Sequence, residues 1–268
     1  MTITELYKLF CEHPVITTDT RNCPADSIFF ALKGETFNGN KFALQALENG
    51  CQYAIVDETD DSTAGNPRVI KVDNVLETMQ KLANHHRKQL GTRIIGITGT
   101  NGKTTTKELI AAVLAEKYNV LYTQGNLNNH IGVPKTLLRL TAEHEIAVIE
   151  MGANHPGEIK TLAEIAEPDC GIITNVGRAH LGGFGSFEGV VRTKGELYDF
   201  LRRSNATVFI HAENEHLLNM AGGLTLIKYG TQPAEGLLVT GETGECAPFL
   251  SFTWHREGGE THNVQTKL

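Results

Sequence analysis

Arg93-Ile-Ile-Gly-Ile-Thr-Gly-Thr-Asn-Gly-Lys-Thr-Thr-Thr106 is the stretch of sequence that decides the fold. Its first part, Arg93 to Thr98, is rich in β-branched residues and predicts a short buried strand. The glycines within residues 99–102 then predict a flexible loop. From Thr104 to Tyr118 apolar residues recur at helical spacing, so the loop leads directly into a helix.

A strand, a glycine loop, Lys-Thr and a helix, in that order, are typical of a loop that holds phosphate groups. Backbone N–H groups of the loop and the positive end of the helix attract phosphate oxygens. Lys103 is placed to reach the β- and γ-phosphates, and the Thr104 hydroxyl to bind Mg²⁺. The general motif has glycine where this chain has Ile97, so the match is to a narrower form, Gly-Thr-Asn-Gly-Lys-Thr. The alternative is a chance glycine loop before a helix, which would have to place the lysine and both threonines by accident.

The composition is that of a globular protein and excludes several classes of function. Of the 268 residues, 40% are hydrophobic and 21% charged, which suits one large or two ordinary domains. No apolar run approaches the roughly 20 residues of a membrane span, and the polar N-terminus is unlike a signal peptide. The formal charge of −7 argues against nonspecific nucleic-acid binding, so an anionic ligand needs local positive groups.

The cysteines point to the cellular compartment. The five cysteines are scattered, and no pair has the Cys-x-x-Cys spacing of a zinc or redox motif. An odd number of dispersed cysteines indicates reduced thiols and not a disulfide framework. We therefore expect a cytoplasmic protein.

Two regions differ in pattern, and we place the boundary between them at Gly91. Residues 1–90 predict a smaller α/β domain, which ends in a helix that Asn74 caps. In residues 91–268 strands alternate with helices, which predicts a mostly parallel sheet with helices on both faces. The strands expected there are 93–98, 120–123, 146–151, 171–176 and 206–210. Toward the end of the chain, glycine turns separate β-like segments and predict hairpins, and Asn263 to Leu268 resembles the interior of a strand.

Ligands of parallel sheets gather at the carboxyl ends of strands, so polar residues there are candidates for a site. Glu150 closes one strand, and a carboxylate beside a triphosphate serves best as a Mg²⁺ ligand, although a surface glutamate explains the residue equally well. His180 follows the next strand. It is either a metal ligand or an ordinary polar loop residue, and the second is the more common case. Lys194 falls on a helix, where lysine is usually solvated.

The other histidines carry weaker signals. His85 and His86 are adjacent on the helix that Asn74 caps, so their side chains should diverge, and we expect both at the surface or facing a partner. A second group follows a strand and either flanks a purine or forms an ordinary loop. Its members are His211, Asn214 and His216.

Several segments together resemble the Mur ligase family of peptidoglycan synthesis, over nearly all of the chain. The matching segments are Gly99-Thr-Asn-Gly-Lys-Thr-Thr105, Gln124-Gly-Asn-Leu-Asn-Asn-His-Ile-Gly-Val-Pro134, Glu150-Met-Gly-Ala-Asn-His-Pro-Gly-Glu-Ile159, Asn175-Val-Gly-Arg-Ala-His-Leu-Gly-Gly-Phe-Gly-Ser186, Thr193-Lys-Gly-Glu196, Asp19-Thr-Arg21 and Phe29-Phe-Ala-Leu-Lys-Gly34. The form Ala-His-Leu with Phe-Gly-Ser is similar to the members that add D-alanyl-D-alanine to UDP-N-acetylmuramoyl-tripeptide. Members that add the third amino acid typically have Asp-His-Leu-Asp instead.

The resemblance implies roles for particular residues. Thr104 and Glu150 would hold one Mg²⁺ ion, while His180 and a carbamylated Lys194 would hold a second. The residues implied in ATP binding are Gly99, Thr100, Asn101, Gly102, Lys103, Thr104, Thr105 and Asn214, and those implied in catalysis are Lys103, Lys194 and His180. The residues implied in substrate binding are Thr20, Arg21, Lys33, Gly34, Asn128 and Asn129.

The resemblance also implies an activity. Residues 1–90 would bind the UDP-muramoyl peptide, and residues 91–268 would form an incomplete ATP-binding domain of an amide ligase that works through an acyl phosphate. The family's C-terminal Rossmann-like domain is absent from this sequence, so we expect a truncated chain that is inactive or weakly active alone. We expect a monomer that neither binds nucleic acid nor inserts into a membrane. The alternatives are another Mur ligase, a folylpolyglutamate synthetase-like ligase, or a nucleotide-binding module without catalysis.

Overall fold

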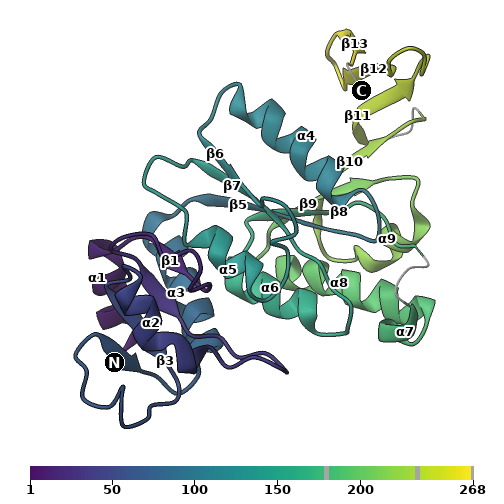
Figure 1. The fold of residues 1–268 in the computed structure, drawn as a ribbon. Coiled ribbons are helices and arrows are strands. Elements are labelled where there is room, and N and C mark those ends of the chain that lie inside the picture. The colour runs from purple at the N-terminus through teal and green to yellow at the C-terminus, as the bar shows by residue number, and fades with distance from the viewer. Residues whose placement is uncertain (178–180, 233–235, 267–268) are drawn as a thin grey trace. The chain divides into compact units, whose positions relative to one another are not determined.

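The computed structural model describes residues 1–177, 181–232 and 236–266 (Figure 1). The chain divides into two compact units. The first comprises residues 1–93, 111–149 and 164–167, and the second comprises residues 94–110, 150–163 and 168–268. Both are built from strands and helices, so the predicted α/β class is confirmed. Within the described ranges, no helix combines the length and the apolar character needed to cross a bilayer.

The N-terminal part of the first unit is a parallel sheet with the strand order β1-β2-β3-β4. Its strands are β1 (Ile16–Thr17), β2 (Ile28–Phe30), β3 (Tyr53–Val56) and β4 (Val69–Lys71). Its helices are α1 (Ile3–Glu12), the 3₁₀ helix η1 (Gly39–Phe42), α2 (Ala43–Glu48) and α3 (Val75–Leu90). Apolar side chains of β2 and β3 pack against α2, which buries Ala43 and Ala46. This packing accounts for the short apolar runs in the sequences of β2 and β3.

The remainder of the first unit contains α5 (Gly132–Leu137) and the parallel pair β6 (Val120–Tyr122) and β7 (Ile146–Glu150). Helix α3 packs against both α1 and α5. It begins and ends as predicted, with the Asn74 side chain accepting from Glu77 N–H at 2.9 Å and with Gly91 in a left-handed conformation at φ 67°.

The surface position expected for His86 is wrong. The ring is buried, with Nε2 2.9 Å from the Leu140 carbonyl oxygen and Nδ1 3.3 Å from the Tyr7 hydroxyl. His86 continues the buried stripe of α3 that starts at Val75 and Met79, and α1 covers this stripe. The helical spacing from Val75 and Met79 therefore indicated a buried position, whereas the polarity of histidine favoured the surface.

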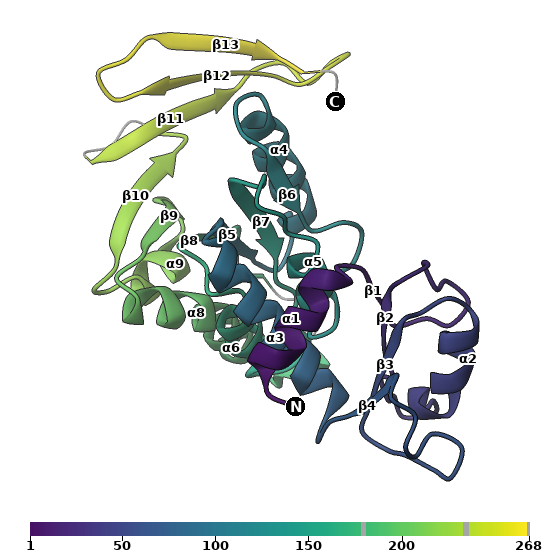
Figure 2. The same cartoon turned by 90° about the vertical axis from the view of Figure 1, so that its left-hand side faces the viewer.

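In the second unit the strands hydrogen-bond in the order β13-β12-β11-β10-β9-β8-β5. Their bounds are β5 (Arg93–Thr98), β8 (Cys170–Ile173), β9 (Thr207–His211), β10 (Thr225–Gly230), β11 (Leu237–Thr243), β12 (Ser251–Arg256) and β13 (Thr261–Gln265). Neighbours from β5 to β11 run parallel, whereas β11, β12 and β13 are antiparallel and form the long strands at the top of Figure 2. The predicted parallel sheet and terminal hairpins are thus confirmed.

The helices that begin in the second unit are α4 (Lys103–Ala115), α6 (Glu158–Ala166), α7 (Leu181–Phe184), α8 (Phe187–Arg203) and α9 (Glu215–Met220). Strand β10 and helix α9 were not predicted. Both lie in a segment where glycines and short polar stretches interrupt the regular spacing of apolar residues. Strand β10 pairs with β9 on one side and β11 on the other, and this pairing could not be predicted from its local sequence.

Two glycines bring α8 close to the strands beneath it. A Cβ atom on Gly96 of β5 would lie 3.4 Å from Leu197 Cδ1, and one on Gly171 of β8 would lie 2.8 Å from Leu201 Cδ1. Both leucines are fully buried on α8. Because the strands carry no side chain at these points, α8 seats directly on them and holds Lys194, one turn earlier, in a buried position.

Candidate active site

The loop between β5 and α4 needs glycine at two positions. Gly99 has φ 148° and Gly102 has φ 75°, conformations that residues with a Cβ rarely adopt. A Cβ on Gly99 would also collide with the side-chain oxygen of Thr174. The backbone of this loop is therefore set by glycine, as a phosphate-binding loop requires.

The segment after β8 holds the loop in place. The N–H of Thr100 donates to the Asn175 carbonyl oxygen at 3.0 Å, and the N–H of Asn101 donates to Asn175 Oδ1 at 3.1 Å. Asn175 Nδ2 in turn donates to the Asn101 carbonyl oxygen at 2.9 Å. Asn175 was not among the predicted site residues, although an amide at the end of the neighbouring strand was a usable signal.

Lys103 folds back over the loop. Its Nζ donates to the carbonyl oxygens of Gly99 at 2.8 Å and Thr100 at 2.9 Å. Burial lowers the pKa of Lys103, while the nearby Glu150 carboxylate opposes this shift. The ammonium group is thus partly desolvated and held by neutral acceptors, so a phosphate would bind it more strongly than these carbonyls do.

Thr104 and Glu150 bring two oxygen ligands together. The Thr104 hydroxyl donates to Glu150 Oε2 at 3.0 Å and lies 3.3 Å from Oε1, and the glutamate is only 1% exposed. Adjacent ligands of octahedral Mg²⁺ lie about 2.9 Å apart, given Mg–O distances of about 2.0–2.1 Å. The described residues hold no cluster of three or more His, Cys, Asp or Glu side chains suited to a metal. Two protein oxygens nonetheless fit a Mg²⁺ ion that takes its other ligands from phosphates and water.

Lys194 is buried, with 3% of the residue exposed, contrary to the solvated lysine that a helix position usually implies. Burial and, to a smaller extent, the charge of Lys103 lower its pKa to about 8, and Glu196 and Glu158 act in the opposite direction. Its Nζ lies 5.5 Å from the centre of the Phe184 ring. His180, the other residue predicted for the second metal, lies outside the described residues.

The residues expected near a purine lie between the end of β9 and the start of α9. Asn214 caps this helix, accepting from Leu217 N–H at 3.2 Å. The ring of His211 stacks on Tyr229 with centroids 5.5 Å apart, and its Nε2 lies 3.7 Å from Glu213 Oε2. Thr105 is exposed on the first turn of α4.

The residues predicted to bind substrate all belong to the first unit. Arg21, whose side chain is 88% exposed, forms a two-pronged pair with Asp19 at 2.7–3.2 Å, and the carbonyl oxygen of Thr20 accepts from Asn49 at 2.8 Å. Hydrogen bonds from Arg21 lower the pKa of Asp19 to about 2.

Lys33, beside Gly34, is also paired with carboxylates. Its Nζ lies 2.7 Å from Glu58 Oε1 and 3.0 Å from Asp57 Oδ1, and these hydrogen bonds raise its pKa. The cation is already neutralised in this structure, so an anionic substrate would have to compete with both carboxylates.

Asn128 and Asn129 precede α5. Asn129 Oδ1 accepts from the N–H groups of Ile131 at 3.1 Å and Gly132 at 2.8 Å, so its carbonyl oxygen shapes the entry to the helix. Asn129 is exposed and Asn128 half-buried. Asn128 and Asn129, like the other residues predicted to bind substrate, thus lie in the first unit.

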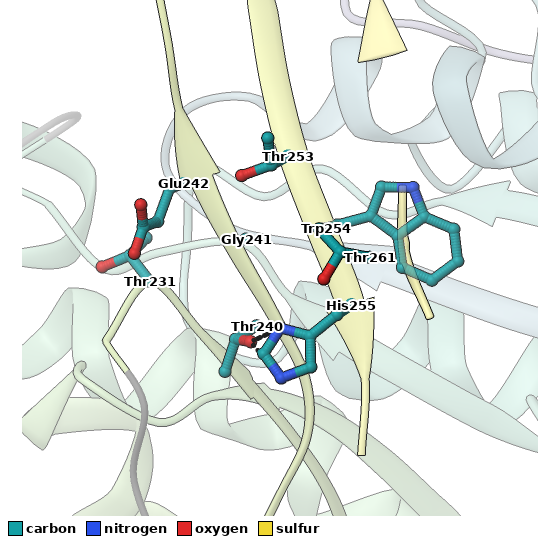
Figure 3. A pocket seen from close by; sticks show the side chains of 8 residues that line it. All are labelled: Thr231, Thr240, Gly241, Glu242, Thr253, Trp254, His255 and Thr261. Atoms are coloured by element: carbon teal, nitrogen blue, oxygen red, sulfur yellow. Dashed lines mark hydrogen bonds between the residues drawn. The ribbon is translucent and has the colours of Figure 1, made fainter. Parts of the chain in front are cut away.

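A separate pocket of about 190 Å³ lies on the β11–β12 hairpin (Figure 3). Its lining residues are Thr231, Thr240, Gly241, Glu242, Thr253, Trp254, His255 and Thr261. The Thr240 hydroxyl and His255 Nδ1 are 2.7 Å apart within it. None of the predicted site residues lines this pocket, so we base the candidate site on the loop around Lys103.

Comparison with known proteins relates this geometry to a family. Residues 97–260 match the Mur ligase middle domain, and residues 14–87 match the model described as Mur ligase family, catalytic domain. The UDP-N-acetylmuramoyl-tripeptide--D-alanyl-D-alanine ligase of Bacillus subtilis is 43% identical over 216 residues, covering 81% of this chain and 47% of the relative. The protein of the same name from Escherichia coli is 44% identical over 204 residues, covering 76% of this chain and 44% of the relative. The chain therefore spans about half the length of these curated relatives.

Two solved structures support the same relationship. MurF from Acinetobacter baumannii superimposes with a TM-score of 0.86 at 31% identity, covering 98% of this chain and 60% of that one. MurF ligase from Thermotoga maritima, in complex with ADP, gives 0.83 at 28% identity, covering 94% of this chain and 57% of that one. Since the middle-domain match alone covers more than half of the sequence, the chain belongs to the Mur ligase family.

Proposed function

We propose that this chain carries the substrate- and nucleotide-binding parts of an ATP-dependent ligase that joins D-alanyl-D-alanine to UDP-N-acetylmuramoyl-tripeptide. The observation that carries the proposal is the grouping of Lys103, Thr104 and Glu150 on a glycine-set loop. The names of the curated relatives support the substrates, and the ADP complex of the Thermotoga maritima relative supports the nucleotide. We assign substrate binding to residues 1–90 and ATP binding to residues 91–268.

In the first step, the terminal carboxylate of the tripeptide attacks the γ-phosphorus of ATP, which gives an acyl phosphate and ADP. Backbone N–H groups at the start of α4 and the Lys103 ammonium hold the phosphate oxygens, so the transferred group is fixed and its charge is balanced. In the second step, the amine of D-alanyl-D-alanine attacks the acyl carbon and phosphate leaves.

Thr104 and Glu150 are the residues that would hold the first Mg²⁺. A bound Mg²⁺ would neutralise charge on the β- and γ-phosphates. Because its carboxylate is almost fully buried beside Thr104, Glu150 presents a fixed anionic ligand to that position.

We propose that Lys194 is carbamylated. Its lowered pKa, about 8, increases the fraction of neutral amine near neutral pH, and only the neutral amine adds CO₂, releasing one proton. The product is a carbamate whose oxygens, with His180, would serve a second Mg²⁺. Intact mass measured in bicarbonate and in CO₂-free buffer tests this, because the carbamate adds the mass of CO₂ to Lys194.

In the first unit, the proposed substrate contacts are Thr20, Arg21, Lys33, Gly34, Asn128 and Asn129. Arg21 and Lys33 supply donors to an anionic substrate, each in competition with its present carboxylate partners. We further propose a cytoplasmic monomer, consistent with the five cysteines all being free thiols. Light scattering on the purified chain tests the monomeric state.

The test is a ligation assay on two proteins. One is the 268-residue chain, and the other is an extended chain in which the part of the Bacillus subtilis relative beyond the match continues this sequence. We expect ADP release by the extended chain only when both UDP-muramoyl tripeptide and D-alanyl-D-alanine are present, and much slower release by the shorter chain. ADP release that prefers UDP-muramoyl dipeptide or a folate would replace the proposed substrate. Nucleotide binding without ligation of any of these would favour a noncatalytic module.

A further inference from the structure

His155 lies in the loop that joins β7 to α6, downstream of Glu150. Its side chain is 66% exposed, yet the backbone around it is firmly held. The N–H groups of Asn154 and His155 donate to Glu158 Oε2 at 2.6 and 3.1 Å. Nδ1 of the His155 ring lies 3.2 Å from Oε1 of the same carboxylate.

This pairing fixes the tautomer of the ring. A carboxylate only accepts hydrogen bonds, so Nδ1 carries the proton and Nε2 is the unprotonated nitrogen. Partial burial raises the pKa of Glu158, but the hydrogen bonds from Asn154 and His155 outweigh burial and lower the pKa overall. An ionised carboxylate at Nδ1 orients an imidazole and makes its other nitrogen a better proton acceptor.

A second carboxylate ties the same loop to the helix of Lys194. Glu196 of α8 accepts from the N–H groups of Gly157 at 2.7 Å and Lys160 at 2.8 Å. Two hydrogen bonds therefore join the segment after His155 to α8, two residues from Lys194.

Helix α7 contacts both His155 and Lys194. A Cβ atom on Gly183 would collide with the Asn154 carbonyl oxygen and would lie 3.6 Å from His155 Cδ2. The next residue, Phe184, carries the ring over which Lys194 Nζ lies. Glycine at 183 thus allows His155 to lie against the short helix, and the next residue of that helix, Phe184, contacts Lys194.

Among the residues that the structure describes, the groups that contact His155 or its loop come from α6, α7 and α8. Glu158 comes from α6, Gly183 of α7 adds no side chain, and Glu196 of α8 is bonded to the loop backbone. The other described histidines of the second unit have different surroundings: His211 stacks on Tyr229, His216 meets Phe187 edge to face, His255 bonds Thr240 and His262 stacks on Trp254.

We propose that His155 is the general base of the second step, with Glu158 as its positioning residue. The inference rests on the proposed function. The amino group of a dipeptide has a pKa of about 8 and is mostly ammonium at neutral pH, so it must lose a proton before it can attack. His155 Nε2 takes that proton and the amine forms the C–N bond. As the C–O bond to phosphate breaks, the second nitrogen proton leaves with the phosphate, and His155 returns its proton to solvent.

The experiment separates the two steps with a second nucleophile. Hydroxylamine is mostly unprotonated at neutral pH, so it traps the acyl phosphate as a hydroxamate without needing a base. In the extended chain, His155→Gln should slow ligation of D-alanyl-D-alanine about 10-fold at pH 7, because only about a tenth of an amine with a pKa of about 8 is neutral there, and it should leave hydroxamate formation within about twofold. Raising the pH to 9 should shrink the deficit, because the amine then deprotonates by itself. Glu158→Gln keeps an acceptor for the backbone and should slow ligation about threefold, less than the loss of the base itself, with hydroxamate formation again maintained.

His262→Gln is the matched control, since this exposed histidine lies on β13, and both rates should stay unchanged. Equal loss of ligation and hydroxamate in His155→Gln, or a deficit that persists at pH 9, would mean that His155 is structural and would overturn the proposal. Unchanged ligation would overturn it as well. If the unmodified extended chain forms neither product, the proposed function itself fails, and this inference fails with it.

Discussion

The two units treat their cationic side chains in opposite ways. In the second unit, burial lowers the pKa of both Lys103 and Lys194, and their charges repel each other. In the first unit, hydrogen bonds to carboxylates raise the pKa of both Arg21 and Lys33. One set of cations is desolvated before any ligand arrives, and the other is already neutralised at the surface.

The difference indicates what each set is built to do. Burying an unpaired cation costs free energy in the folded chain. That cost is removed when an anion pairs with the cation or when a chemical modification removes its charge. An exposed cation paired with carboxylates gains little from exchanging one partner for another. In the proposed function, the buried cations of the second unit would gain the most from binding phosphate, whereas the paired cations of the first unit would contribute selectivity for the UDP-linked substrate.

The largest effect is expected from Lys103→Met. Removing a preorganised cation from transferred phosphate should lower ADP formation by the extended chain by about 10²–10³-fold. ADP should also bind about 10-fold more weakly to the 268-residue chain, as measured by calorimetry. Lys33→Met should leave ADP affinity unchanged and alter only the KM for the UDP-linked substrate. Equal losses of ADP affinity in the two variants would erase the contrast between the units.

Next in size is the effect of Lys194→Met on stability. The pKa of Lys194 falls from 10.5 unfolded to about 8 folded, so the folded state binds fewer protons between these values. Below pH 8 the full cost of burying the charge applies, about 3 kcal/mol, and above pH 10.5 it disappears. In CO₂-free buffer, the variant should be more stable than the original at pH 7 by up to this amount, with the gain shrinking as pH rises from 8 to 10.5.

Urea unfolding at pH 7 and pH 10 measures this gain. Lys33→Met is the comparison from the first unit and should have the opposite sign, a small loss from breaking an exposed ion pair. A destabilised Lys194→Met at pH 7 would show that the buried amine has favourable partners and would remove the basis for its proposed carbamylation.

Gly99→Ala should have the third-largest effect. Alanine at φ 148° is strained, and its Cβ would collide with the Thr174 side chain, so we expect a loss of about 2 kcal/mol or more and weaker ADP binding. Gly34→Ala is the matched control in the first unit, where an added Cβ meets nothing within 4 Å. Thermal unfolding of both variants checks the pair. A stable Gly99→Ala that still binds ADP would show that the loop tolerates another conformation.

The strand, the glycine loop and the helix around Lys103 could be predicted from the sequence because their pattern is local. A strand, glycines with positive φ and a lysine at a helix start follow one another along the chain, so their spacing is sufficient to place them. Asn74 and Gly91 were identified as helix ends for the same reason. Neither needs knowledge of which element packs against which.

Whether a side chain is buried, and which groups it pairs with, depends on contacts between residues distant in the sequence. Neither property could be predicted from the local sequence. Lys194 is buried because Gly96 and Gly171 let α8 approach the strands, which no local pattern around the lysine announces. Lys33 looked free for an anion, but Asp57 and Glu58 reach it from a later strand end. The roles assigned to these lysines stay predictions, and the proposed assays address them.

His86 provides the smallest and most specific test, because it is the buried titratable group that breaks the pattern of the first unit. Burial lowers its pKa, the Leu140 carbonyl opposes this, and His85 adds to the lowering. The folded state therefore binds fewer protons than the unfolded chain, whose histidine has a pKa near 6.5. Stability that is present above pH 6.5 should be lost as the pH falls below it, by at most about 1.4 kcal/mol per pH unit. His86→Gln keeps a polar side chain without titration, so its stability between pH 7 and 5 should decline less steeply than that of the original chain, whereas exposed His262→Gln should follow the original. Parallel declines in all three would show that His86 does not couple pH to the packing of α1 on α3, and acid sensitivity would then have to be sought among the carboxylate pairs of the surface.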